Sequence, residues 1–128
     1  MKYLNRNVTS VSSSGSNLRL NGAVVLTGAS TIDANNDAIS FTSTVDGNSS
    51  GRNLTVDSGT ANTTFSGNVG GSTALADISL TGAVIDAAAL TASGDITYTN
   101  SGSSTISGSI SASSFTKAGS GQLTFKPS

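Results

Sequence analysis

The sequence predicts an all-β fold, a parallel β-solenoid of about six coils, from three observations. Helix formers are scarce, because the chain has no Glu and a single Gln, and Ser, Thr, Asn and Gly fill the polar positions; these residues are poor in helix interiors. Aromatic residues make up only 5% of the 128 residues, too few for a wide core. Short apolar segments recur about every 20 residues, which is the length of one solenoid coil.

Six apolar–polar–apolar triplets carry this period. Each triplet places two side chains on one face and one on the other, which is typical of a strand. Their first residues lie 21, 15, 24, 18 and 27 positions apart, so turns of different lengths must absorb the variation. The triplets occupy positions 18–20, 39–41, 54–56, 78–80, 96–98 and 123–125.

An antiparallel β-sandwich is the alternative fold, since it also needs short strands at regular intervals. A sandwich core usually needs bulky aromatic residues to span two sheets, and the Ser- and Gly-rich run at 102–114 would fill it poorly. In a solenoid, small side chains fit tight corners, and stacked Ser, Thr and Asn side chains can hydrogen-bond along the axis. We therefore expect one solenoid segment over residues 1–128, with residues 1–16 as an irregular N-terminal lead-in.

Two segments resemble repeats of bacterial exported proteins. Residues 115–125, FTKAGSGQLTF, meet every position of the autotransporter-associated β-strand repeat, hydrophobic-Thr-Lys-x-Gly-x-Gly-x-Leu-Thr-hydrophobic. Residues 64–82 are similar to repeats in filamentous-haemagglutinin-like exoproteins. The resemblance implies a right-handed parallel β-helix in a stalk or adhesin passenger, located outside the cell or on the bacterial surface. It brings no catalytic residues with it.

The composition argues against several classes of protein. Net charge is −1 and the six cations are scattered, which disfavours a nucleic-acid partner. No stretch approaches the roughly 18 apolar residues of a membrane span. Because the chain has no His and no Cys, it offers no disulfide, zinc or haem site and no triad-type nucleophile, and we expect no cofactor.

All seven acidic residues are aspartates, and we expect turn or surface roles for them. None stands close to another in the pattern of a glycoside hydrolase carboxylate pair, and no aromatic cluster is present to stack a sugar. The run at 33–37, DANND, has enough oxygens for Ca²⁺ but lacks the Gly and Glu of an EF-hand, so a loop is expected there. The aspartates are Asp33, Asp37, Asp46, Asp57, Asp77, Asp86 and Asp95.

Two further patterns favour ordinary structural explanations. Thr-x-Thr pairs on a flat solenoid face can order water and bind ice, but only two pairs occur, at 42–44 and 97–99. Gly119 and Gly121 flank Ser120 as in a phosphate-binding loop, yet no helix is expected after them. We therefore expect no catalytic, cofactor-binding or metal-binding residues.

These observations predict a non-catalytic structural segment, a stalk or spacer of a bacterial secreted or surface adhesin-type protein. The alternative is a self-assembling extracellular filament subunit whose open β-helix ends join head to tail or by edge strands. A carbohydrate-binding or carbohydrate-active module is a lesser alternative. The expected partners are a second copy of the chain, or host and cell-surface glycans bound through loops.

Overall fold

The structure, a computed structural model, describes residues 7–12, 17–49 and 51–126, with the backbone alone for residues 7–12. These residues form fifteen strands and no helix. The strands are β1 (Asn7–Ser12), β2 (Leu18–Leu20), β3 (Val24–Asp33), β4 (Ile39–Phe41), β5 (Val45–Gly47), β6 (Leu54–Asp57), β7 (Thr63–Phe65), β8 (Ile78–Gly82), β9 (Ile85–Asp86), β10 (Leu90–Thr91), β11 (Asp95–Asn100), β12 (Ser104–Ile106), β13 (Ile110–Ser111), β14 (Ser114–Ala118) and β15 (Leu123–Phe125).

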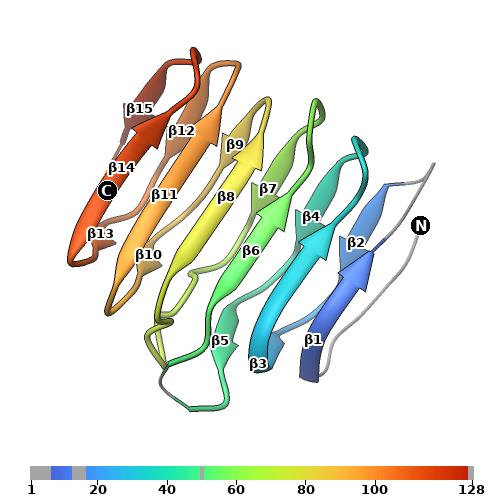
Figure 1. Cartoon of the computed structure of the whole chain (residues 1–128), viewed down its shortest axis with the longest axis vertical. Coiled ribbons are helices and arrows are strands. Elements are labelled where there is room, and N and C mark those ends of the chain that lie inside the picture. The colour runs from blue at the N-terminus through green and yellow to red at the C-terminus, as the bar shows by residue number, and fades with distance from the viewer. Residues whose placement is uncertain (1–6, 13–16, 50, 127–128) are drawn as a thin grey trace.

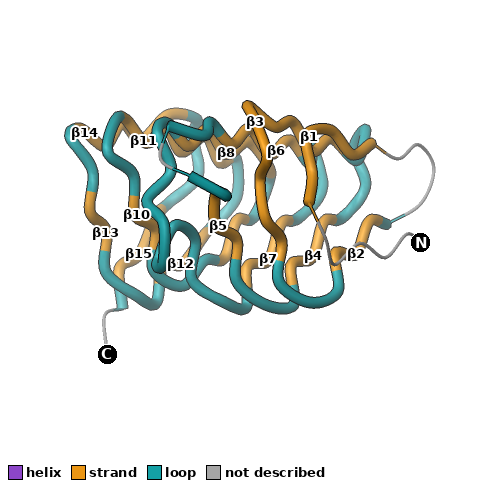
Figure 2. Tube along the Cα trace, turned by 90° about the horizontal axis from the view of Figure 1, so that it is seen from below, coloured by secondary structure: helices purple, strands orange, loops and turns teal. Residues whose placement is uncertain are grey.

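Each coil of the chain passes through three faces. The largest face is the sheet β1-β3-β6-β8-β11-β14, which is turned toward the viewer in Figure 1. The second face consists of β2-β4-β7-β9 and is continued by β12 and β15. The third face holds the beginning of β3 and then β5, β10 and β13. Successive coils lie side by side along one axis (Figure 2), so the fold is an all-β parallel β-solenoid of about five coils.

The six triplets belong to two faces of the coil, so their spacing does not measure the length of a coil. Those at 18–20, 39–41 and 123–125 lie on the second face, whereas those at 54–56, 78–80 and 96–98 lie on the largest face. Along the second face alone, equivalent positions are 21, 24, 22, 19 and 19 residues apart. A triplet is short enough to occur on more than one face of the same coil. The sequence alone does not show to which face a triplet belongs.

The strand pairing also tests the alternative antiparallel sandwich and the expectation that residues 1–16 are irregular. Every pairing among the described strands is parallel, which excludes the antiparallel sandwich. Within residues 1–16, expected as an irregular lead-in, Asn7–Ser12 forms strand β1 because β3 provides a parallel partner for its backbone. Residues 1–6 and 13–16 lie outside the described residues.

The core is built from columns, each a set of inward-facing residues at equivalent positions of successive coils. We name five columns by their last residue. They are the Leu123 column (Leu18, Ile39, Thr63, Ile85, Ser104, Leu123), the Phe125 column (Leu20, Phe41, Phe65, Ala87, Ile106, Phe125), the Ile110 column (Val24, Val45, Val69, Leu90, Ile110), the Phe115 column (Ser30, Leu54, Ile78, Ile96, Phe115) and the Lys117 column (Ile32, Val56, Leu80, Tyr98, Lys117).

Stacking within a column buries the side chains because each residue is covered by its counterparts one coil before and one coil after. Phe41 and Phe65 show this most clearly, since their rings stack with centroids 4.5 Å apart and planes 10° apart. Such aromatic pairs add roughly 0.5–1.5 kcal/mol beyond the area they bury. The few aromatic residues therefore suffice, because the core is narrow and lies between the three faces of each coil.

Candidate functional site

The candidate site is the C-terminal end of the solenoid, where the five columns stop. The earlier members of these columns are at most 5% exposed. Their last members are only partly buried or exposed, because no described coil covers them, and Phe125 is 55% exposed. At the other end of the columns, Leu18 and Leu20 are 1% and 0% exposed. Among the described residues, the columns are therefore open at their last members, whereas Leu18 and Leu20 at the other end of the second face are buried.

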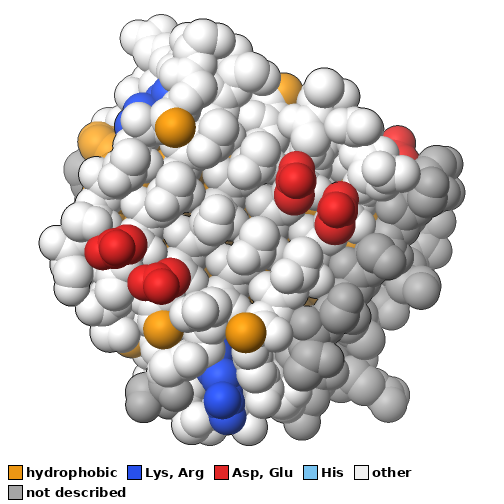
Figure 3. All heavy atoms as spheres, viewed as in Figure 1, with side chains coloured by type: hydrophobic (Ala, Val, Ile, Leu, Met, Phe, Trp, Pro, Cys, Tyr) orange, Lys and Arg blue, Asp and Glu red, His pale blue; other side chains and the backbone are white. Residues whose placement is uncertain are grey.

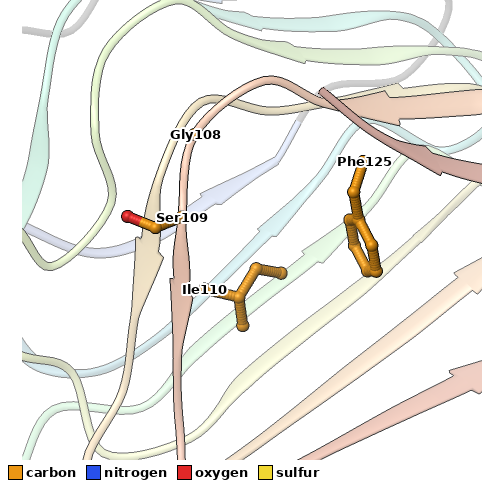
Figure 4. A pocket seen from close by; sticks show the side chains of 4 residues that line it. All are labelled: Gly108, Ser109, Ile110 and Phe125. Carbon is orange, nitrogen blue, oxygen red and sulfur yellow. The ribbon is translucent and has the colours of Figure 1, made fainter. Parts of the chain in front are cut away.

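An apolar cavity of about 280 Å³ opens at this end, lined by Gly108, Ser109, Ile110 and Phe125. The side chains of Ile110 and Phe125 come from the third and second faces and face the same space (Figure 4). Phe125 also meets the ring of Phe115 edge-on, with centroids 6.0 Å apart. The end thus presents apolar surface that a further layer of side chains could cover.

Lys117 is the charged residue in these five columns. It pairs with Tyr98 of the preceding coil, so it occupies the next inward-facing position of the column. Its Nζ donates hydrogen bonds to the carbonyl oxygens of Ala118 at 2.7 Å and Gly119 at 3.1 Å. An ammonium group has three donors, so its own turn satisfies two and leaves one for water or for a partner. Among the last members of the five columns, Ile110, Phe115, Leu123 and Phe125 are apolar and Lys117 carries a positive charge.

Asn100 fastens the last coil to the one before it. Its side chain is buried, and the two N–H groups of Nδ2 are shared among three acceptors: the carbonyl oxygen of Gly102 at 2.8 Å, Ser104 Oγ at 3.0 Å and the carbonyl oxygen of Gln122 at 3.0 Å. The bond to Gln122 crosses between coils. The Oδ1 atom is buried without a hydrogen-bond partner, which costs about 1–3 kcal/mol. The amide therefore serves as a donor that holds two turns together.

Tyr98 closes the core beneath the open end. Its side chain is 0% exposed and its hydroxyl donates to the carbonyl oxygen of Ile85. Burial raises the pKa of Tyr98 well above its usual range, the charge of Asp86 raises it further, and a hydrogen bond with Ser104 partly offsets both. The phenol is therefore neutral at physiological pH.

The structure places six of the seven aspartates in turns or in bonds between coils. Asp33 and Asp57 accept bonds from backbone N–H groups two residues ahead, as turn-forming aspartates do. The other four accept bonds from the next coil: Asp46 from Ser72 and Thr73, Asp77 from Asp95, Asp86 from Thr105, and Asp95 from Ser114. Sequence reasoning predicted turn roles but missed these bonds, because the partners lie 18–27 residues apart.

The fold also creates acidic pairs that the sequence does not show. Acidic side chains gather in two pairs on the largest face (Figure 3). The strand register brings Asp33 beside Asp57, and Asp77 lies against Asp95 in the next coil. In both pairs, carboxylate oxygens already accept backbone N–H bonds. Like charges on neighbouring strands repel one another, and the backbone bonds compensate part of that cost.

Hydroxyl side chains form a row on the same face. The register aligns one residue from each of five strands: Thr31, Thr55, Ser79, Thr97 and Thr116. The parallel row two residues further on is mixed, consisting of Asp33, Asp57, Thr81, Thr99 and Ala118. Of the Thr-x-Thr pairs noted in the sequence, 97–99 belongs to these rows, whereas Thr42 bonds to Gly22 and Leu20 in a turn.

The remaining sequence patterns have structural explanations. The loop at 33–37 contains Asn35 and Asn36 at positive φ, 54° and 72°. Gly119 has a φ of 79°, and a Cβ on Gly119 or Gly121 would collide with the backbone of the preceding turn at Asn100 or Gly102. This pair of glycines therefore lets two turns stack closely.

Metal and membrane sites are not apparent in the described part of the chain. There, no group of three or more His, Cys, Asp or Glu side chains is placed to hold a metal ion. The same residues form no helix that is long and apolar enough to cross a membrane.

The geometry defines the class of protein as an all-β parallel β-solenoid. Comparison of the chain with models of protein families, with curated proteins and with solved structures finds no match.

Proposed function

We propose that the chain is a non-catalytic structural segment, a stiff β-solenoid spacer of a bacterial adhesin-type protein that is secreted or displayed on the cell surface. The observation that carries the proposal is the continuity of the core columns, which pass from coil to coil through buried side chains. In such a fold each coil is bonded to both of its neighbours, so the segment has little freedom to bend. The use of most aspartates in turns and bonds between coils fits a structural role.

The repeat-like segment at 115–125 supports an exported, adhesin-type parent. It forms strand β14, a turn and strand β15, which pair with β11 and β12 of the preceding coil. Its glycines allow the turn to stack on the turn before it, and its Lys117 bonds the carbonyl oxygens of that turn. The two glycines that define part of the resemblance thus have a role in stacking coils, whereas Lys117 bonds its own turn.

Stiffness can be measured by spin labelling, and the absence of cysteine makes the labelling specific. Arg19 and Thr124 are exposed on the second face, at the first and last strands of that face. Their register positions lie five coil steps apart, which at about 4.8 Å per step gives a backbone separation of roughly 24 Å. In the double variant Arg19→Cys, Thr124→Cys we expect one narrow distance distribution. A broad distribution in a chain that remains folded would contradict a spacer role.

A self-assembling filament subunit is the second candidate, and the open C-terminal end is the observation that favours it. Head-to-tail growth also needs a matching open surface at the N-terminal end. There, the first described members of the columns are already buried. Electron microscopy of the concentrated chain tests this candidate, since a subunit with this function would form filaments.

A further inference from the structure

Polar residues are buried at one corner of the coil, and among the described residues they recur at every second coil. At this corner, where the largest face ends, the strand register aligns Ala34, Ser58, Gly82, Asn100 and Gly119. The second face then begins with the Leu123 column, whose members after these five residues are Ile39, Thr63, Ile85, Ser104 and Leu123. Each polar corner residue is therefore followed by a hydroxyl residue, and each Ala or Gly by an aliphatic residue.

The Ser58 corner consists of Ser58 and Thr63, both of which are buried. Thr63 Oγ1 donates a hydrogen bond to Ser58 Oγ at 2.8 Å. The Ser58 hydroxyl shares its own proton between the carbonyl oxygens of Ala61 at 3.1 Å and Thr81 at 3.3 Å, and Thr81 belongs to the next coil. In that coil the corner residue is Gly82, where an added Cβ would collide with Ser58 Oγ. The Ser58 corner therefore fits a coil that presents a carbonyl oxygen and then a glycine.

The Asn100 corner consists of Tyr98, Asn100 and Ser104, which are all buried, and it bonds to both neighbouring coils. Toward the preceding coil, Ser104 Oγ accepts a bond from the backbone N–H of Ile85 at 2.9 Å, and the Tyr98 hydroxyl donates to the carbonyl oxygen of Ile85. Toward the following coil, Asn100 Nδ2 donates to the carbonyl oxygen of Gln122 at 3.0 Å. Ser104 also bonds to Asn100 and to Tyr98, so the three side chains form one buried network.

The apolar columns of the largest face do not select one register by themselves. Inward positions recur at every second residue of a strand, so a shift of two residues between neighbouring coils keeps apolar side chains in the core. Such a shift between β6 and β8 would place Val56 against Ile78 instead of Leu80. The turns do not select it either, since equivalent positions on the second face are 19 to 24 residues apart.

Hydrogen bonds on the surface discriminate weakly between registers, because water replaces their partners after a shift. Asp77, Asp86 and Asp95, which accept bonds from the next coil, are all exposed. The Ser58 and Asn100 corners are shielded from water, so a shifted register would leave their hydroxyl and amide groups unpaired. Buried polar groups of this kind specify the register of some packed elements.

We propose that the two polar corners are register locks, which select the native alignment of successive coils over alignments shifted by two residues. The Ser58 corner fixes its coil against the next one, and the Asn100 corner fixes its coil against both neighbours. Because the locks recur at every second coil, each coil from the one that contains Ser58 to the one that contains Gly119 contacts a lock. This role is independent of what the segment spaces or binds.

Pairs of introduced cysteines report the register, because the natural chain has no cysteine. The native pair is Ser79 with Thr97, which are register partners on β8 and β11; neighbouring strands lie about 4.8 Å apart, which suits a disulfide. Two mismatched pairs are Ser79 with Thr99, and Thr81 with Thr97. Both lie roughly 8 Å apart in the native register, which is too far for a disulfide. A two-residue shift in either direction would bring one mismatched pair together.

The lock variant is Tyr98→Phe, Ser104→Ala, which keeps the apolar core filled but removes the side-chain bonds to Ile85. The matched control is Asp77→Ala, which removes an exposed bond between the same two coils. In a glutathione redox buffer we expect only the native pair to crosslink in the natural and control backgrounds. In the lock variant, the crosslinked fraction of a mismatched pair should rise at least about tenfold, as expected for the loss of two buried hydrogen bonds.

Circular dichroism checks that each variant is folded, and Ser104→Ala alone carries the test if the double variant is unfolded. A folded lock variant in which only the native pair crosslinks would mean that the corner adds stability without selecting the register. Mismatched crosslinks in the natural chain, or an equal rise in the Asp77→Ala control, would mean that the Asn100 corner does not hold the register. Any of these results overturns the proposal.

Discussion

Replacing Phe65 with Ala tests the stacked core directly. Phe65 is 4% exposed and its ring stacks on Phe41 with centroids 4.5 Å apart. Removing a buried Phe side chain costs about 3–5 kcal/mol. For a chain of this length, 1 kcal/mol corresponds to a shift of about 4 °C in the unfolding midpoint. We therefore expect Phe65→Ala to lower the midpoint by about 12–20 °C.

Phe125→Ala is the matched control, because Phe125 belongs to the same column and has the same side chain but is 55% exposed. Fully burying a Phe contributes about 1.5–3 kcal/mol, so the half-buried ring should contribute about 1 kcal/mol and the midpoint should fall by about 4 °C. Thermal unfolding followed by circular dichroism compares the two variants. Equal losses in the two variants would refute the stacking of columns along the axis.

Two further predictions concern a turn and a titrating group. Gly119 and Gly51 both have positive φ, 79° and 86°, but an added Cβ would collide with the carbonyl oxygen of Asn100 at Gly119 and would meet nothing at Gly51. We expect Gly51→Ala to lower the free energy of unfolding by about 1–2 kcal/mol and Gly119→Ala to lower it clearly more. Urea titration measures both losses. Similar losses in the two variants would show that the turns are not closely stacked. The raised pKa of Tyr98 in the folded state means that the unfolded chain loses this proton first as pH rises above its usual pKa of 10.0. The contribution of Tyr98 to stability should therefore be constant below pH 10 and should fall above it by up to about 1.4 kcal/mol per pH unit. Tyr98→Phe removes this term, so the natural chain should show the steeper alkaline decline; identical pH profiles for the two chains would contradict the burial of the phenol.

The triplets show how far the sequence could predict the fold. Their alternation identified strands, and all six lie in strands of the structure. The strand class and the parallel solenoid followed from composition and period, and both are confirmed. The sequence did not show which face each triplet belongs to, because the two inward side chains of 39–41 and of 54–56 look alike in sequence although they lie on different faces of the coil.

The candidate site was harder to predict than the fold. The match at 115–125 drew attention to Lys117, Gly119 and Gly121 as members of a repeat. It did not show that Lys117 points into a core column at an open end, or that Asn100 bonds the last turn through Gln122. The acidic pair of Asp33 and Asp57 and the hydroxyl row were likewise hidden, since their members are separated by a full coil in the sequence.

The sequence by itself determined the kind of backbone, because the choice of Ser, Thr, Asn and Gly over helix formers is local and acts residue by residue. It also determined the charge at each position, including the absence of acids from the first 32 and the last 33 residues. The tertiary structure alone decided which residues are neighbours, since that depends on the length of every coil in between. It thereby decided that Phe125 and Lys117 are the last described members of their core columns, and that Phe125 is 55% exposed whereas Phe65 in the same column is 4% exposed.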